Sequence, residues 1–251
     1  MNNYEDEIDF IIDQELNNSN VNKYIEQINP NIDLKYNSLN IAVGKPGTSK
    51  TTTFMKTMMK VCQVPNNYHM ILYVSDLEVD DTINSLMKYI TIPMIKVTYN
   101  QFLDTFEKLI KSKNLYWQAF REKNKKLVMQ YAKQLYIKNP SYNIQTMILC
   151  DDASWIFSKS SPLIKHLNKL RHYQCTFWLN IHVWKSIPVE MRGLITSTYI
   201  CRGFSRQILQ NIIRQLATSE PFEKIFRIYN SLVDYEKLFI DNQDSIIKII
   251  S

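Results

Sequence analysis

Residues 38–62 read SLNIAVGKPGTSKTTTFMKTMMKVC and join an apolar run, a turn with two glycines and a helix-like pattern. The apolar run over 38–44 predicts a buried strand, and apolar residues spaced three and four apart predict a helix over 50–62. A strand, a glycine turn and a helix in this order are the context in which the pattern G-x-x-x-x-G-K-[ST] binds phosphate. These residues therefore predict a nucleotide-binding P-loop.

The match to that pattern has one irregular position. Gly44, Lys50 and Thr51 fall where the pattern requires them, but Ser49 occupies the place of the second glycine. The chain holds 4 glycines in 251 residues, and Gly44 and Gly47 are two of them, which indicates that the turn needs their backbone freedom. The residues expected to contact the nucleotide are Gly44, Lys45, Pro46, Gly47, Thr48, Ser49, Lys50, Thr51 and Thr52.

Ser49 can be accommodated in the loop in two ways. If its position requires a positive φ, the Cβ atom costs about 1–2 kcal/mol. If the residue already has the backbone geometry of a helix entrance, serine is harmless there and can cap the helix. Neither case removes Lys50 or Thr51, so the loop residues alone leave open a working ATP site, a decayed one and a turn that only resembles one.

The chemistry of the loop follows from its backbone and two side chains. Backbone N–H groups would cradle phosphate oxygens at the positive end of the following helix. Lys50 is expected to reach the β- and γ-phosphates, and the Thr51 hydroxyl is expected to bind Mg²⁺.

Two aspartates follow a second apolar strand, in the sequence MILCDD at residues 147–152. A buried parallel strand delivers the residues after it to the carboxyl edge of the sheet, where open α/β folds bind their ligands. Asp151 is expected to hold the Mg²⁺ shell, and Asp152 is expected to orient or deprotonate the attacking water.

The segment LRHYQCTFWLNIHVWKSIPVEMRG, residues 170–193, supplies further candidates. Its strand ends in Asn180 or His182, and either side chain could sense the γ-phosphate. Arg171 lies before this strand and Arg192 after it. An arginine supplied in trans is the usual means of stabilising charge on a transferring phosphoryl group. We expect the helix that carries Arg171 to end near the carboxyl edge of the sheet.

The rest of the chain alternates between apolar strands and helical patterns, which predicts a mainly parallel sheet covered by helices on both faces. We interpret 1–37 as an acidic N-terminal arm and connector, with a helix at 5–16, and 38–251 as one catalytic domain. The further strands are expected at 70–76, 94–99, 146–152, 175–182, 197–202 and 235–241. The further helices are expected at 79–89, 101–137, 162–172, 205–216 and 220–231.

Composition narrows the class of protein. The net charge is +6, but residues 1–30 carry −6, so the remainder carries +12, a profile common among proteins that bind polyanions. No apolar run approaches the roughly 18 residues of a membrane span, and the acidic start does not resemble a signal peptide. The cysteines are expected to be reduced core residues, and the histidines near Cys175 fit no zinc spacing.

Two segments are candidates for DNA contact. Residues 108–138 hold nine lysines and arginines against one acid, interleaved with aromatic residues. Such a segment could neutralise phosphates without reading sequence, or it could be a solvated helical face whose aromatic residues lie in the core. Residues 158–166, after the aspartates, are the second candidate, as a loop facing the pore of a ring.

The motifs GKPGTSKT, MILCDD, LRHYQ and IHVWKSIPVEMRG occur in this order over roughly residues 38–205. In this they resemble the genome-packaging ATPases of poxvirus-like large DNA viruses and virophages, which belong to the FtsK/HerA superfamily. The resemblance implies an α/β P-loop NTPase fold of the ASCE type with a RecA-like core. By position it assigns Lys50 and Thr51 to the phosphates, Asp151 to magnesium and Asp152 to water activation.

The resemblance places His182 where the family has a sensor glutamine, so His182 and Ser49 are the two departures from its pattern. It implies ATP and Mg²⁺ as cofactors and sequence-independent double-stranded DNA as a partner. It also implies a ring, expected to be a hexamer, and a capsid or portal protein as a further partner, with no membrane. The expected locations are the virus factory in the host cytoplasm and the virion.

Two other functions fit part of the sequence. GKPGTSKT also resembles the loop of AAA+ ATPases, although the distance to Asp151 is long for that class and no helical lid is evident. A DNA-binding or capsid-assembly module that keeps ATP only for structure is the alternative outside enzymes. ATPase turnover with and without DNA distinguishes a motor from such a module.

Overall fold

The computed structural model describes residues 27–29, 32–64, 67–77, 81–154, 161–216 and 218–251. The helix expected at 5–16 and the first part of the segment 158–166 lie outside these residues. Within them, no helix is both long enough and apolar enough to cross a membrane.

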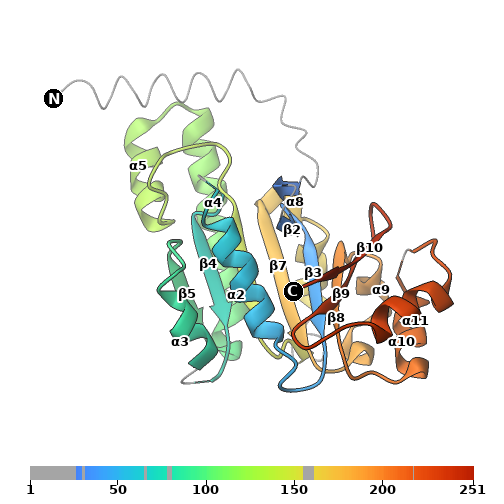
Figure 1. The fold of residues 1–251 in the computed structure, drawn as a ribbon. Helices are drawn as coiled ribbons and strands as arrows, with labels where there is room; N and C mark the ends of the chain where they lie inside the picture. Colours follow the sequence, from blue (N-terminus) through green and yellow to red (C-terminus); the bar gives the residue numbers. More distant parts are fainter. Residues whose placement is uncertain (1–26, 30–31, 65–66, 78–80, 155–160, 217) are drawn as a thin grey trace.

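An eight-stranded sheet forms the centre of the molecule, in the order β10-β9-β8-β3-β7-β6-β4-β5 (Figure 1). The strands from β8 to β5 are parallel, while β9 runs antiparallel to both β8 and β10. Their bounds are β3 Leu39–Val43, β4 Met70–Val74, β5 Met94–Val97, β6 Thr146–Cys150, β7 Cys175–Ile181, β8 Ser197–Cys201, β9 Lys237–Asp241 and β10 Ile246–Ile250. The predicted fold class, a mainly parallel sheet flanked by helices, is confirmed.

Helices cover both faces of the sheet because most central strands are apolar on both sides. On one face, α2 (Lys50–Val61) and α3 (Asp81–Met87) pack against a core that includes Trp178 and Tyr199. On the other face, α4 (Tyr99–Arg121), α10 (Arg206–Ile213) and α11 (Phe222–Asn230) pack against the neighbouring residues of the same strands, such as Phe177 and Leu179. The shorter elements are α5 Lys125–Gln134, α7 Ser161–Leu167, α8 Leu170–Tyr173, α9 Val189–Arg192 and the single turn η1 Trp184–Ser186.

Four regions differ from the expectation, and one of them is β10, where no strand was expected. The helix expected over 101–137 is two helices, α4 and α5, because Lys123 adopts a left-handed conformation with φ 53° and Asn124 caps α5. The helix expected over 162–172 is divided into α7 and α8. Residues 27–35, expected within a polar connector, form strands β1 (Gln27–Asn29) and β2 (Ile32–Lys35).

The β2 strand joins the core through Ile32 and Leu34, which are buried with α2. Its Lys35 pairs with Asp241 at the end of β9, with 2.7 Å between Nζ and Oδ2. Alternating apolar and charged residues are typical of a half-buried strand. The sequence of β2, IDLK, has this alternation. The cysteines are free thiols, and Cys150, Cys175 and Cys201 are buried as expected.

Candidate active site

The turn after β3 has the tight packing that a P-loop requires. The Gly44 N–H donates to Ile181 O at 3.1 Å. A Cβ atom on Gly44 would lie 2.4 Å from Thr48 Oγ1 and 2.5 Å from Cys201 Cβ, so no side chain fits there. Gly47 has φ 75°, a conformation that favours glycine. The turn therefore uses both glycines for backbone reasons.

Ser49 also has a left-handed backbone, with φ 63° and ψ 29°, and its side chain makes no capping hydrogen bond. Of the two possibilities considered above, the strained one is observed. Its carbonyl accepts hydrogen bonds from Thr53 N and Thr53 Oγ1, at 2.9 and 2.8 Å. The first turn of α2 thus holds Ser49 in place despite the cost of its Cβ atom.

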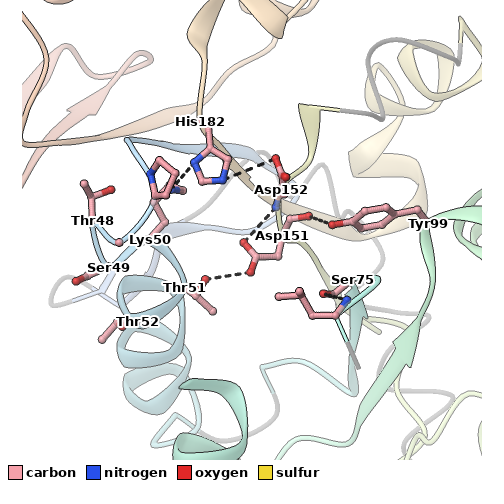
Figure 2. A pocket seen from close by; sticks show the side chains of 13 residues that line it. Thr48, Ser49, Lys50, Thr51, Thr52, Ser75, Tyr99, Asp151, Asp152 and His182 are labelled. Carbon is pink, nitrogen blue, oxygen red and sulfur yellow. Dashed lines mark hydrogen bonds and ion pairs between the residues drawn. The ribbon is translucent and has the colours of Figure 1, made fainter. Parts of the chain in front are cut away.

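Lys50 is the cation at the centre of the loop (Figure 2). Its side chain is buried, and Nζ donates to Gly44 O at 2.9 Å and to Lys45 O at 3.0 Å. His182 Nδ1 lies 3.1 Å from the same Nζ. Burial lowers the pKa of Lys50, while Cys201, Asp151 and Asp152 act to raise it. The two carbonyls hold the ammonium in place, and an ammonium at the start of a helix suits polyphosphate oxygens.

Asp151 lies directly opposite the start of α2. Its Oδ2 accepts a hydrogen bond from Thr51 Oγ1 at 3.1 Å, and its Oδ1 accepts one from Asn180 Nδ2 at 2.9 Å. Asn180 is fully buried and is itself held by Trp178 Nε1, which donates to Asn180 Oδ1 at 2.9 Å. Strands β6 and β7 and helix α2 therefore bring one hydroxyl and one carboxylate together.

Asp152 and His182 face the opening of the pocket. Asp152 is exposed, has φ 42° and accepts a hydrogen bond from Ser154 Oγ at 2.9 Å. His182 Nε2 lies 3.9 Å from Asp152 Oδ1, and His182 is half-buried. Of the two sensor candidates, His182 lines the pocket, whereas Asn180 lies behind it and contacts Asp151.

Tyr99 is a pocket residue that the sequence did not reveal. It begins α4, its hydroxyl donates to Asp151 O at 3.0 Å, and its N–H donates to Asp76 Oδ1 at 2.8 Å. Burial and the nearby carboxylates of Asp152, Asp151 and Asp76 raise the pKa of Tyr99 to about 12. The hydroxyl therefore remains a donor at neutral pH. The sequence predicted Tyr99 as the end of a strand over 94–99 and gave no motif for its hydroxyl, whose position depends on the tertiary contacts with Asp76 and Asp151.

These residues surround one pocket of about 480 Å³. Its lining consists of Pro46, Gly47, Thr48, Ser49, Lys50, Thr51, Thr52, Ser75, Leu77, Tyr99, Asp151, Asp152 and His182. Among the described residues, no group of three or more His, Cys, Asp or Glu could hold a metal by itself. Thr51 with Asp151 does fit Mg²⁺, which binds through one or two carboxylates, waters and substrate phosphates.

The candidate arginines lie away from the pocket. α8 directly precedes β7, and β7 is parallel to β3, so Arg171 lies at the amino edge of the sheet, opposite the P-loop (Figure 1). The expectation that its helix ends near the carboxyl edge is wrong, because an element that leads into a parallel strand must end where that strand begins. Arg192 donates through Nε and Nη2 to Ile187 O, at 3.0 and 2.7 Å.

The basic segment 108–138 forms the second half of α4 and all of α5, and α5 leads back to the amino edge where β6 begins. Three of the segment's aromatic residues, Tyr116, Trp117 and Phe120, are buried as the core interpretation expects, whereas Tyr131 is half-buried and Tyr136 is exposed. Lys113 is buried as well, whereas Lys126 and Lys133 on α5 are exposed. The segment combines an aromatic core with an exposed basic face.

The family comparison covers most of the chain. Residues 31–247 match the family model described as "Poxvirus A32 protein". A sequence search of the curated proteins gives no significant match.

Three solved structures have a similar fold. The genome packaging NTPase B204 from Sulfolobus turreted icosahedral virus 2, in complex with ATP-gammaS, has a TM-score of 0.58 at 16% identity, covering 86% of this chain and 97% of that one. B204 from Sulfolobus turreted icosahedral virus, described as the DNA-packaging ATPase, has a TM-score of 0.58 at 13% identity over the same shares. EssC from Geobacillus thermodenitrificans has a TM-score of 0.55 at 10% identity, covering 82% of this chain and 38% of that one. These likenesses describe the fold, while the family model covers well over half of the sequence: this chain belongs to the poxvirus A32 protein family.

Proposed function

We propose that this protein is an ATP-driven motor that translocates double-stranded viral DNA into a capsid. One observation carries the proposal: Lys50, Thr51, Asp151 and Asp152 line a single pocket at the carboxyl edge of a P-loop fold. Membership of the poxvirus A32 family supports it. So does the similar fold of B204, which is described as a genome packaging NTPase and was solved with ATP-gammaS.

The position of each pocket residue suggests its role in ATP hydrolysis. Lys50 binds the β- and γ-phosphate oxygens, and N–H groups of the turn surround them, apart from those of Gly44 and Thr48, which donate to Ile181 O and Lys45 O. Thr51 and Asp151 hold Mg²⁺, which neutralises charge that develops on those phosphates. Asp152, exposed at the pocket opening, orients the attacking water and accepts its proton. His182 lies between Lys50 and Asp152, where it contacts the γ-phosphate.

Tyr99 and Asn180 position Asp151 without contacting the reacting atoms. Tyr99 binds the backbone carbonyl of Asp151, and Asn180 binds its carboxylate. Catalytic groups need such support because small displacements cost much of the rate.

The second part of the proposal is a ring, expected to be a hexamer, in which Arg171 serves a neighbouring subunit. Arg171 is exposed at the amino edge and lies three residues before Gln174. The Gln174 carbonyl accepts hydrogen bonds from Thr146 N and Lys113 Nζ, both at 2.9 Å. The Gln174 side chain accepts from Ile144 N at 2.5 Å through Oε1 and donates to Tyr142 O at 3.2 Å through Nε2. A turn held this firmly can present an arginine to a partner with little loss of entropy.

The third part of the proposal is the path of the DNA. We place it along the exposed lysines of α5 and the turns beside it, because a motor must bind phosphates without reading bases. A capsid or portal protein would bind the ring, and the protein would act in virus factories of the host cytoplasm and in the virion.

The decisive experiment measures ATP turnover and DNA movement together. The full-length protein should hydrolyse ATP faster with double-stranded DNA present and should displace a third strand from a triplex substrate. Lys50→Ala should abolish both activities, since it removes the charge on the β- and γ-phosphates. ATP binding without turnover would favour the structural-ATP module. Turnover that DNA does not stimulate, with no strand displacement, would favour another class of P-loop ATPase such as AAA+.

A further inference from the structure

Given the function proposed above, the geometry of the pocket also determines on which side of strand β3 the nucleoside of ATP lies. Asp151 and Asp152 follow β6, on one side of the P-loop strand β3, so the γ-phosphate end points to that side. β8 lies on the other side of β3, and Cys201 at its end packs directly against Gly44. A triphosphate whose γ end faces the aspartates therefore directs its nucleoside toward β8 and β9.

The loop before β9 borders this side of the P-loop. Lys237, the first residue of β9, is paired with Cys201 across the antiparallel strands, so residues 233–236 extend beyond the carboxyl end of β8. The turn after β8 also approaches the P-loop. A Cβ atom added to Gly203 in this turn would lie 3.9 Å from Lys45 Cδ. Figure 1 shows β9 beside β8, and β8 beside β3.

Four contacts hold this loop in one shape, and one of them is the hydrogen bond from Glu236 N to Val233 O at 3.2 Å. Arg202 Nη1 lies 2.9 Å from Asp234 Oδ1. The Val233 N–H donates to Glu236 Oε2 at 2.7 Å. Lys237, which is 2% exposed, donates through Nζ to Tyr235 O at 2.6 Å. The loop is therefore tied both to β8 and to a buried lysine of β9.

The loop exposes the aromatic side chain of Tyr235, and backbone strain accompanies this exposure. Tyr235 is 65% exposed and has φ 70°, a left-handed conformation that is a true outlier for a bulky residue. Val233 beside it is 60% exposed. Strain of this kind persists where surrounding contacts impose it, and it gathers at ligand sites. Among the residues that line the phosphate pocket, the aromatic one is Tyr99, which lies on the γ-phosphate side.

We propose that Tyr235 is the platform on which the adenine base of the nucleotide stacks, with Val233 extending its apolar surface. Aromatic rings offer a flat surface to any base, and the strained backbone directs the ring away from the core. The Arg202–Asp234 pair and Lys237 position the platform, and the P-loop holds the phosphates.

The test separates base binding from phosphate binding. Affinities are measured by titration calorimetry on the full-length protein with Mg²⁺, using a non-hydrolysable ATP analogue and inorganic tripolyphosphate. Tyr235→Ala should bind the ATP analogue about 10-fold more weakly, the scale of one lost base stack. It should bind tripolyphosphate as the wild type does. Tyr235→Phe should retain the wild-type affinity for both ligands.

Tyr89→Ala is the matched control, because Tyr89 is also half-exposed, at 51%, and follows α3. It should change neither affinity. An unchanged ATP affinity in Tyr235→Ala, or an equal loss for both ligands, would overturn the platform. Failure of the wild type to bind either ligand would instead contradict the proposed function itself.

Discussion

Ser49 shows how a P-loop can tolerate a serine where the pattern has glycine. Its left-handed backbone is held by two hydrogen bonds to its carbonyl, while its hydroxyl caps nothing. A left-handed conformation costs an L-residue about 1–2 kcal/mol, and glycine avoids this cost but loses about 0.5–1 kcal/mol of chain entropy on folding.

We therefore expect Ser49→Gly to raise the free energy of unfolding by up to about 1 kcal/mol. Ser49→Ala is the control: it retains the Cβ atom and removes only the hydroxyl, so its stability should equal that of the wild type. Urea denaturation of the three proteins measures the difference. A glycine variant less stable than the alanine variant would contradict the assignment of strain to this position.

The left-handed backbone of Asp152 limits which residues can replace it without strain. Its φ of 42° is one that Asn adopts readily, and an Asn side chain keeps the oxygen that accepts from Ser154. Asp152→Asn should bind ATP like the wild type and turn it over about 10²–10⁴-fold more slowly, because an amide cannot accept the proton of water.

Asp151→Asn gives the contrast to this variant. It replaces a carboxylate that binds Thr51 and Asn180, so it should weaken the binding of Mg²⁺ with ATP. Turnover and equilibrium binding of both variants measure the two effects. Equal losses of binding would show that the roles of the two aspartates are divided wrongly.

Residues of the site were predictable where a motif fixed their position, and not otherwise. Lys50 and Thr51 follow a predicted strand through the glycine turn, Asp151 and Asp152 end another, and the carboxyl ends of the two strands lie at one edge of the sheet. Tyr99 was expected to end the strand over 94–99, but it begins α4 and no motif marks its role. Its place depends on contacts with Asp76 and Asp151, which are a matter of tertiary structure.

At the scale of elements, apolar runs identified the seven strands from β3 to β9, because most of these strands are buried on both faces, including the antiparallel β9. β10 was missed although the turn residues DNQDS precede it, a hairpin signal. The break between α4 and α5 was hidden because the apolar stripe continues across it, from Phe120 to Val128. The Asn124 cap was the available signal.

The basic face of α5 carries the prediction that belongs to this scale. Lys126 and Lys133 are exposed and lie seven residues apart, so they share a face of the helix. We consider the plot of the logarithm of the binding constant for double-stranded DNA against the logarithm of the salt concentration. Replacing both lysines with Gln should make the slope of this plot less steep by about 2, one unit for each lost phosphate contact. Basal ATPase activity should not change.

Lys60→Gln with Lys88→Gln is the matched control, since both lysines are exposed and lie on α2 and after α3. Fluorescence anisotropy with duplexes of unrelated sequence measures the salt dependence. An equal change in the two double variants would mean that net charge, and not this helix, governs DNA affinity.

At the scale of the whole molecule, the two edges of the sheet have different tasks. The carboxyl edge holds the nucleotide pocket, and the amino edge holds α5 and the turn with Arg171. Because Arg171 lies at the edge opposite the P-loop of its own subunit, it can reach a γ-phosphate only across an interface. Head-to-tail packing brings opposite surfaces of identical subunits together and closes into a ring.

The proposed ring predicts complementation between two inactive variants. Arg171→Ala should bind ATP normally and hydrolyse it about 10³–10⁵-fold more slowly, the range of other arginine fingers. Mixed with Asp152→Asn, it should regain activity, because some interfaces then combine an intact Arg171 with an intact Asp152. Arg192→Ala is the comparison: its guanidinium is bound within its own chain to Ile187 O, so its mixtures with Asp152→Asn should regain nothing beyond the Arg192→Ala activity itself. ATPase assays on mixtures shown to co-assemble measure this. If only the Arg192→Ala mixtures recover, the arginine that acts in trans is Arg192.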